Sequence, residues 1–124
     1  MLKPDQKLAI HFFEQIDKLN GKMGHGVLRY SRNPIACAID LNHGGRSTRD
    51  LLDFGPDAPI YSSVESAMSA GGEVLILGMA PSGGRLPSEM VEEVDRAVSA
   101  GMSVINGLHE QLGPRYPDLP EGQW

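Results

Sequence analysis

The stretch from Glu73 to Glu110 constrains the fold more than any other part of the sequence. An apolar run is followed by a glycine-rich segment, an amphipathic segment and a second apolar run. The order strand, glycine-rich turn, helix, strand is half of a nucleotide-binding α/β unit, in which ligands bind at the carboxyl ends of parallel strands. The stretch therefore predicts a ligand site near Gly83 and Gly84, where the helix begins, without identifying the ligand.

Strands and helices alternate along the rest of the chain as well. Apolar runs predict strands, and capping or amphipathic patterns predict helices between them. The predicted strands cover 7–13, 35–39, 60–61, 74–77 and 104–105, and the predicted helices cover 27–31, 63–70 and a segment between Pro87 and Gly101. Such alternation implies a parallel sheet with right-handed crossovers. We expect an α/β fold, a Rossmann-like three-layer domain with a parallel sheet of about five strands.

The first apolar segment, KLAIHFF at residues 7–13, allows two interpretations. Its apolar residues and Ile16 follow helical spacing, and the pattern alone favours a helix from Asp5 to Leu19. A buried strand fits too, because strands of parallel sheets are continuously apolar. The glycine cluster at 21–26 makes a poor helix interior and predicts a turn before a short helix.

Composition limits the classes of function. The formal net charge of −5 argues against non-specific binding to nucleic acid and to anionic membranes, which both need a basic face. No apolar run approaches the roughly 18 residues that span a bilayer, and the first residues do not resemble a signal peptide. Cys37 is the single cysteine and is expected to be buried. We expect a cytoplasmic protein without a metal site.

The segment 78–87 is the strongest candidate for binding. It is longer than the roughly two to six residues that usually join a strand to a helix. Glycines allow close approach of a ligand, N–H groups near the start of a helix attract an anion, and an arginine adds a charged fork. The alternative is that this segment is an ordinary connection between a strand and a helix and binds no ligand. The candidate cofactor-binding residues in this segment are Gly78, Pro81, Ser82, Gly83, Gly84 and Arg85.

Further candidates come from other strand ends. Gly107, His109 and Glu110 follow the last predicted strand, and His109 and Glu110 are candidate catalytic acid/base groups or ligand contacts. Asp40 ends the second strand, where an acid can bind ribose hydroxyls in dinucleotide-binding folds; a plain turn aspartate is equally consistent. Lys22 lies in the glycine cluster and could bind an anion or remain a surface lysine. The dinucleotide glycine fingerprint and the Walker A pattern are absent from the sequence.

Several of these motifs together resemble a known family. GVLRYS, AIDLNHGGR, LGMAPSGGRLP and AGMSVINGLHEQL are similar to the N-terminal Rossmann-like domain of a bacterial and archaeal family of unknown function. In that family the domain precedes a P-loop NTPase-like domain, and some members are described as D-glutamate N-acetyltransferases, which use acetyl-CoA. The resemblance implies a strand at 7–13, followed by a turn at Lys22–Gly26. Met23 stands where the family usually has threonine.

The resemblance also implies an organisation and a function. We expect residues 1–112 to form the Rossmann-like ligand-binding domain and 113–124 to be a linker towards an absent C-terminal P-loop domain. The domain would bind CoA, acetyl-CoA or a nucleotide, as part of an acyltransferase- or ligase-like enzyme acting on D-glutamate or a related amino acid. It would not be catalytic alone. The alternatives are a non-catalytic docking or oligomerisation domain and an NAD-binding oxidoreductase fragment.

Overall fold

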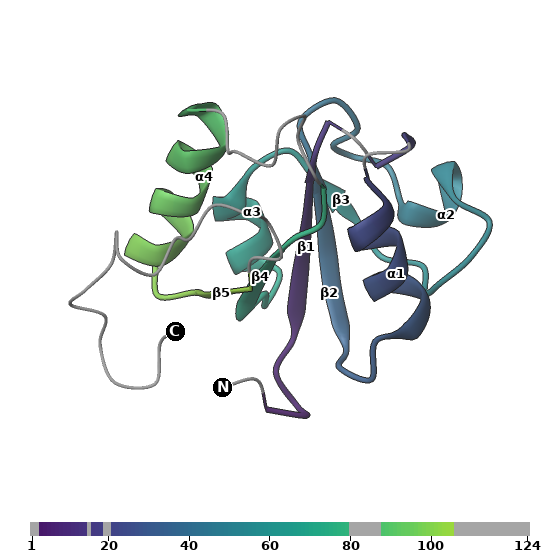
Figure 1. The fold of residues 1–124 in the computed structure, drawn as a ribbon, viewed down its shortest axis with the longest axis horizontal. Helices are drawn as coiled ribbons and strands as arrows, with labels where there is room; N and C mark the ends of the chain where they lie inside the picture. Colours follow the sequence, from purple (N-terminus) through teal and green to yellow (C-terminus); the bar gives the residue numbers. More distant parts are fainter. Residues whose placement is uncertain (1–2, 15, 19–20, 80–87, 106–124) are drawn as a thin grey trace.

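The computed structural model describes residues 3–14, 16–18, 21–79 and 88–105 of the chain. They form a five-stranded sheet in which every strand pair is parallel, and the strand order is β3-β2-β1-β4-β5. Helices lie on both sides of this sheet (Figure 1). The architecture is a Rossmann-like α/β domain, as the alternation of strands and helices predicts.

The elements follow one another in regular alternation. In chain order they are β1 (Leu8–Phe13), α1 (Lys22–Tyr30), β2 (Ile35–Asp40), α2 (Thr48–Leu51), β3 (Ile60–Tyr61), α3 (Val64–Ser69), β4 (Val74–Leu77), α4 (Ser88–Ser99) and β5 (Ser103–Ile105). β1 is the central strand and pairs with both β2 and β4. A central parallel strand is buried on both faces, which explains why β1 is apolar along almost its whole length.

Each face of the sheet has its own core. Ala9, Cys37 and Leu75 pack with residues of α3 and α4, whereas Ile10 and Ala38 pack with Leu28 of α1. Successive residues of a strand point to opposite faces, so the same strands supply both cores. α1 and α2 therefore cover one face and α3 and α4 the other, as Figure 1 shows.

The strand predicted at 7–13 is confirmed, because residues 8–13 form β1, and the helix that spacing alone favoured over 5–19 is excluded. The turn expected at 21–26 is also wrong, because α1 already begins at Lys22 and includes Gly24 and Gly26. Tertiary packing outweighs the low helix propensity of glycine, which costs only about 1 kcal/mol per residue.

Ser63 caps α3 through its side-chain oxygen, which accepts a hydrogen bond from the Ser66 N–H. Tyr30, the last residue of α1, is 77% exposed. Among the described residues, the longest helix is α4, and none has the length and apolar character required to cross a bilayer.

Candidate ligand-binding edge of the sheet

The strand order creates a topological switch point between β1 and β4. From β1 the chain proceeds to β2 on one side of the sheet, and later to β4 on the other side. In open α/β sheets, ligands bind at such a point, outside the carboxyl ends of the strands. β4 also pairs in parallel with β5, with Ile76 opposite Ile105. The segments that follow Leu77 and Ile105 therefore start from neighbouring points on the same edge.

Only three of the predicted site residues belong to the described part of the chain. Lys22, Asp40 and Gly78 are placed by the structure. The roles of the others remain predictions, because Pro81, Ser82, Gly83, Gly84, Arg85, Gly107, His109 and Glu110 lie outside the described residues. The expected boundary at residue 112 lies outside them too. The three described residues come from α1, β2 and the end of β4.

Gly78 lies at a close contact between α1 and β4. The Gly24 N–H donates a hydrogen bond of 2.7 Å to the Gly78 carbonyl oxygen, and the Gly78 N–H donates one of 2.9 Å to the His11 carbonyl oxygen. A Cβ atom on Gly78 would lie 2.8 Å from the Gly24 Cα and 2.8 Å from the Ile10 Cγ2. Gly78 thus permits the first turn of α1 to approach the switch point closely, a role that glycine often has where a helix packs on a strand.

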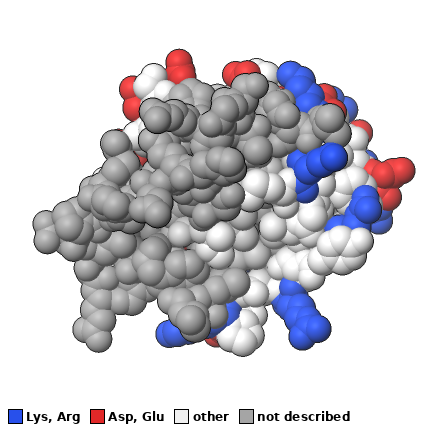
Figure 2. Space-filling model, in the orientation of Figure 1, with Lys and Arg blue, Asp and Glu red and all other residues white. Residues whose placement is uncertain are grey.

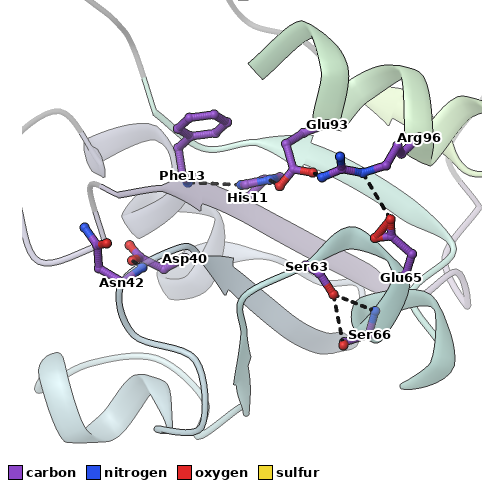
Figure 3. Close-up of polar contacts among 9 residues, drawn as sticks. All are labelled: His11, Phe13, Asp40, Asn42, Ser63, Glu65, Ser66, Glu93 and Arg96. Atoms are coloured by element: carbon purple, nitrogen blue, oxygen red, sulfur yellow. Dashed lines mark hydrogen bonds and ion pairs between the residues drawn. The ribbon is translucent and has the colours of Figure 1, made fainter. Parts of the chain in front are cut away.

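Asp40 holds the segment between β1 and α1. Its carboxylate is fully buried. One oxygen accepts a hydrogen bond of 3.0 Å from the Ile16 N–H. The other accepts one of 3.0 Å from the Asn42 N–H (Figure 3) and lies 2.8 Å from His43 Nδ1. Asp40 stands at the end of β2, as predicted, but all of these partners are protein groups.

Two more contacts fix the same segment. The His25 Nε2 forms a short hydrogen bond with the Ile16 carbonyl oxygen, and the Leu41 N–H donates a hydrogen bond to the Phe13 carbonyl oxygen. Phe13 adopts a φ of 63°, which is uncommon for a residue with a side chain and marks a sharp turn at the end of β1. With Ile16 buried in the core, this segment is anchored to the domain on several sides.

Lys22 provides positive charge at this edge. It is the first residue of α1 and is exposed. The N-terminus of a helix carries a partial positive charge, and its first N–H groups have no acceptor within the helix. Among the described residues, no carboxylate lies within ion-pair distance of the Lys22 ammonium group. The start of α1 and Lys22 can therefore attract an anion together.

A polar network that the sequence reasoning missed lies beneath the edge (Figure 3). The His11 side chain of β1 contacts Glu93 of α4, with 3.2 Å between Nε2 and Oε1. Glu93 forms an ion pair with Arg96, whose Nε lies 3.0 Å from Glu65 Oε1 of α3. The network joins β1 to both helices of one face. The signal that could have revealed it is a single polar residue within an otherwise apolar strand.

The hydrogen bonds of His11 define its protonation. The Phe13 N–H donates to Nδ1 at 3.0 Å, so Nδ1 must be unprotonated and Nε2 carries the proton that is donated to Glu93. The pKa of His11 is lowered from 6.5 to about 3, mainly because the side chain is completely buried. The negative charge of Asp40 raises this pKa, and the positive charge of Arg96 lowers it further. His11 is therefore neutral at physiological pH, and both of its ring nitrogens are occupied.

The described part of the edge is thus suited to binding rather than to proton transfer. Asp40 and His11 are buried and bonded to protein groups. The exposed groups include the start of α1 and the Lys22 side chain, which offer N–H donors and positive charge, and also the carboxylates of Glu14 and Asp17 in the segment after β1. Acid/base chemistry by His109 and Glu110 remains a prediction.

A solved structure and a named enzyme are similar to this chain. A crystal structure of a DUF1611 family protein from Anabaena variabilis matches with a TM-score of 0.90 and 39% sequence identity. The match covers 98% of this chain and 36% of that chain. A D-glutamate N-acetyltransferase from a Pseudoalteromonas species is 27% identical over 111 residues, which make up 90% of this chain and 30% of that protein. This chain therefore spans about a third of the length of these relatives.

The family relationship follows from the sequence itself. Residues 41–121, more than half of the chain, match the model of a Rossmann-like domain of unknown function, DUF1611_N. The strand order and parallel sheet agree with that description. The chain belongs to the DUF1611_N family of Rossmann-like domains.

Proposed function

We propose that this domain is the ligand-binding module of a two-domain enzyme of acyltransferase or ligase type. The ligand is anionic and of the CoA or nucleotide class, with acetyl-CoA as the first candidate. It binds at the carboxyl edge of β1, β4 and β5. The domain is not catalytic alone, and a P-loop NTPase-like domain supplies the rest of the active site. Such metabolites are abundant in the cytoplasm, and we therefore propose that the protein is cytoplasmic.

The observation that carries the proposal is the convergence of strand ends at the switch point. β4 and β5 are parallel neighbours, so the glycine-rich segment after β4 and the Gly-Leu-His-Glu segment after β5 begin side by side. The start of α1, with Lys22, reaches the same edge through the Gly24–Gly78 contact. In the proposal, Gly83, Gly84 and Arg85 hold a phosphate or carboxylate, Gly107 allows close approach of the ligand, and His109 and Glu110 face the same crevice.

The named relative supports the reaction class. A D-glutamate N-acetyltransferase matches this chain over most of its length, and acetyl transfer to an amine requires a bound acetyl donor. We extend this to a substrate of the same chemical kind, D-glutamate or a related amino acid. The identity of 27% supports a shared reaction type more strongly than a shared substrate.

The geometry of Asp40 weighs against the NAD-binding alternative. A ribose would have to compete with Ile16, Asn42 and His43 for a carboxylate that is completely buried. Breaking hydrogen bonds to a buried charged group typically costs about 1.5–3 kcal/mol each.

A thermal-shift panel with acetyl-CoA, CoA, ATP, GTP and NAD tests the proposal, run on this chain and on a full-length relative. A ligand at about 100 times its Kd stabilises a protein by roughly 2.7 kcal/mol. We expect acetyl-CoA or CoA to raise the melting temperature by several degrees, with free adenosine as the control that lacks phosphates. If none of the five ligands stabilises either protein, the domain is a docking or oligomerisation module instead.

A further inference from the structure

An apolar groove of about 610 Å³ lies on the α1 face of the sheet and reaches the carboxyl ends of β4 and β5 at Leu77 and Ile105. Its floor consists of Leu8 and Ile76, and its walls include Val27 of α1 and Ile105 of β5. The polar residues Ser31, Arg32 and Asn33 lie along its margin. An apolar centre with a polar rim is the usual composition of a surface that binds another protein surface.

Exposed hydrophobic side chains distinguish this groove from the rest of the described surface. Among the described residues, the exposed large hydrophobic side chains are Met23, 37% exposed, and Tyr30, 77% exposed, and both line it. Among the described residues in Figure 2, uncharged residues form a continuous area, with Lys and Arg around it. Contiguous exposed apolar surface on a domain marks an interaction site.

The topology explains why the groove exists. The connections from β1 to β2 and from β2 to β3 place α1 and α2 on one face, and the connections to β4 and β5 place α3 and α4 on the other. Right-handed crossovers require this division. Consequently, α1 borders β4 along one side on this face, none of the described helices covers β5 there, and Ile76 and Ile105 lie at the resulting gap.

We propose that this groove docks the remainder of the longer family proteins, so that it is an interface between domains of one chain. The relatives provide the occupant, because this chain covers only 36% and 30% of their lengths. β5 ends with Ile105, which itself lines the groove, so polypeptide that continues from β5 starts beside it. This inference goes beyond the ligand site, because it concerns the α1 face of the sheet, which adjoins the ligand edge at Leu77 and Ile105, and it holds whichever ligand is bound.

Thiol labelling tests the docking. The natural chain has a single cysteine, Cys37, which is fully buried, and burial raises its pKa to about 12; it is therefore silent towards a maleimide. Tyr30→Cys reports on the groove. Ser99→Cys is the matched control, because Ser99 is exposed at the end of α4 on the opposite face.

Each variant is labelled in the 124-residue chain and in a chimera in which this chain replaces the matching third of the Anabaena variabilis relative. We expect Tyr30→Cys to react rapidly in the short chain and about tenfold or more slowly in the chimera, since labelling then needs local opening. Ser99→Cys should react at the same rate in both. A cysteine placed at the Tyr30 equivalent of the native relative provides the same measurement if the chimera does not fold.

Three results would overturn the docking. The first is equal labelling of Tyr30→Cys in the short and long proteins, which would leave the groove open. The second is slow labelling in the short chain at every concentration, which would mean that the chain covers its own groove. The third is protection of the short chain that grows with its concentration, which would assign the groove to a second copy.

Discussion

Two residues without side chains set the distance between α1 and the end of β4. A Cβ atom on Gly24 would lie 2.4 Å from the Phe12 ring and 3.0 Å from the Gly78 carbonyl oxygen. The sequence allowed Gly78 to be predicted as a candidate ligand contact. Its packing role could not be predicted, because the partner glycine is far away in the sequence and no local pattern pairs them.

Gly24→Ala and Gly26→Ala should change stability in opposite directions. Gly24→Ala introduces a clash, and overpacking typically destabilises by about 1–3 kcal/mol. Gly26 lies in the same helix with nothing within 4 Å of an added Cβ, so alanine should stabilise by about 0.5–1 kcal/mol. Urea denaturation of both variants measures the difference. Equal effects of the two substitutions would show that the close contact is absent.

His11 should make stability depend on pH. Its pKa is lowered to about 3 in the folded protein from 6.5, so the unfolded chain binds the proton more readily. The contribution of His11 to the free energy of unfolding is complete above pH 6.5. It is lost as the pH falls towards 3, by up to about 1.4 kcal/mol per pH unit. Urea denaturation at pH 7, 6 and 5 should show a shallower decline for His11→Gln than for the wild type. Parallel declines would mean that His11 does not remain neutral.

At the scale of elements, the sequence predicted the uniform segments well and the mixed segments poorly. β2 and β4 were predicted because fully apolar runs of this length are typical of central parallel strands. β1 was ambiguous because its apolar residues, together with Ile16, also fit helical spacing; Ile16 is buried, but it lies outside the strand. α1 was predicted too short, since glycine propensity says nothing about the contact with Gly78 that favours a helix there.

The segment after β4 carries the sharpest prediction at this scale. Arg85→Ala should weaken binding of acetyl-CoA or a related anion by about 1.5–3 kcal/mol, because it removes a charge-assisted hydrogen bond. Arg32→Ala is the matched control, since Arg32 lies between α1 and β2, at the amino edge of the sheet. Isothermal titration calorimetry measures both. Equal affinities for wild type and Arg85→Ala would remove Arg85 from the site.

At the scale of the whole molecule, alternation of strands and helices was sufficient to predict the Rossmann-like sheet, because crossover handedness leaves few topologies. The sequence predicted where the candidate site lies but did not identify its ligand. The described residues confirm that β4 and β5 are neighbours, whereas the network of His11, Glu93 and Arg96 depends on three-dimensional contacts that no spacing rule reveals.

The most direct test of ligand binding at the carboxyl edge is an NMR titration with acetyl-CoA that follows backbone amide signals. The account predicts shifts that saturate at Lys22, Gly78 and residues 106–110, which come from three separate parts of the sequence. Signals at the amino edge, such as those of Asn33 and Gly72, should stay unchanged. Saturable shifts confined to the amino edge, or none at a concentration where the full-length relative is saturated, would contradict it.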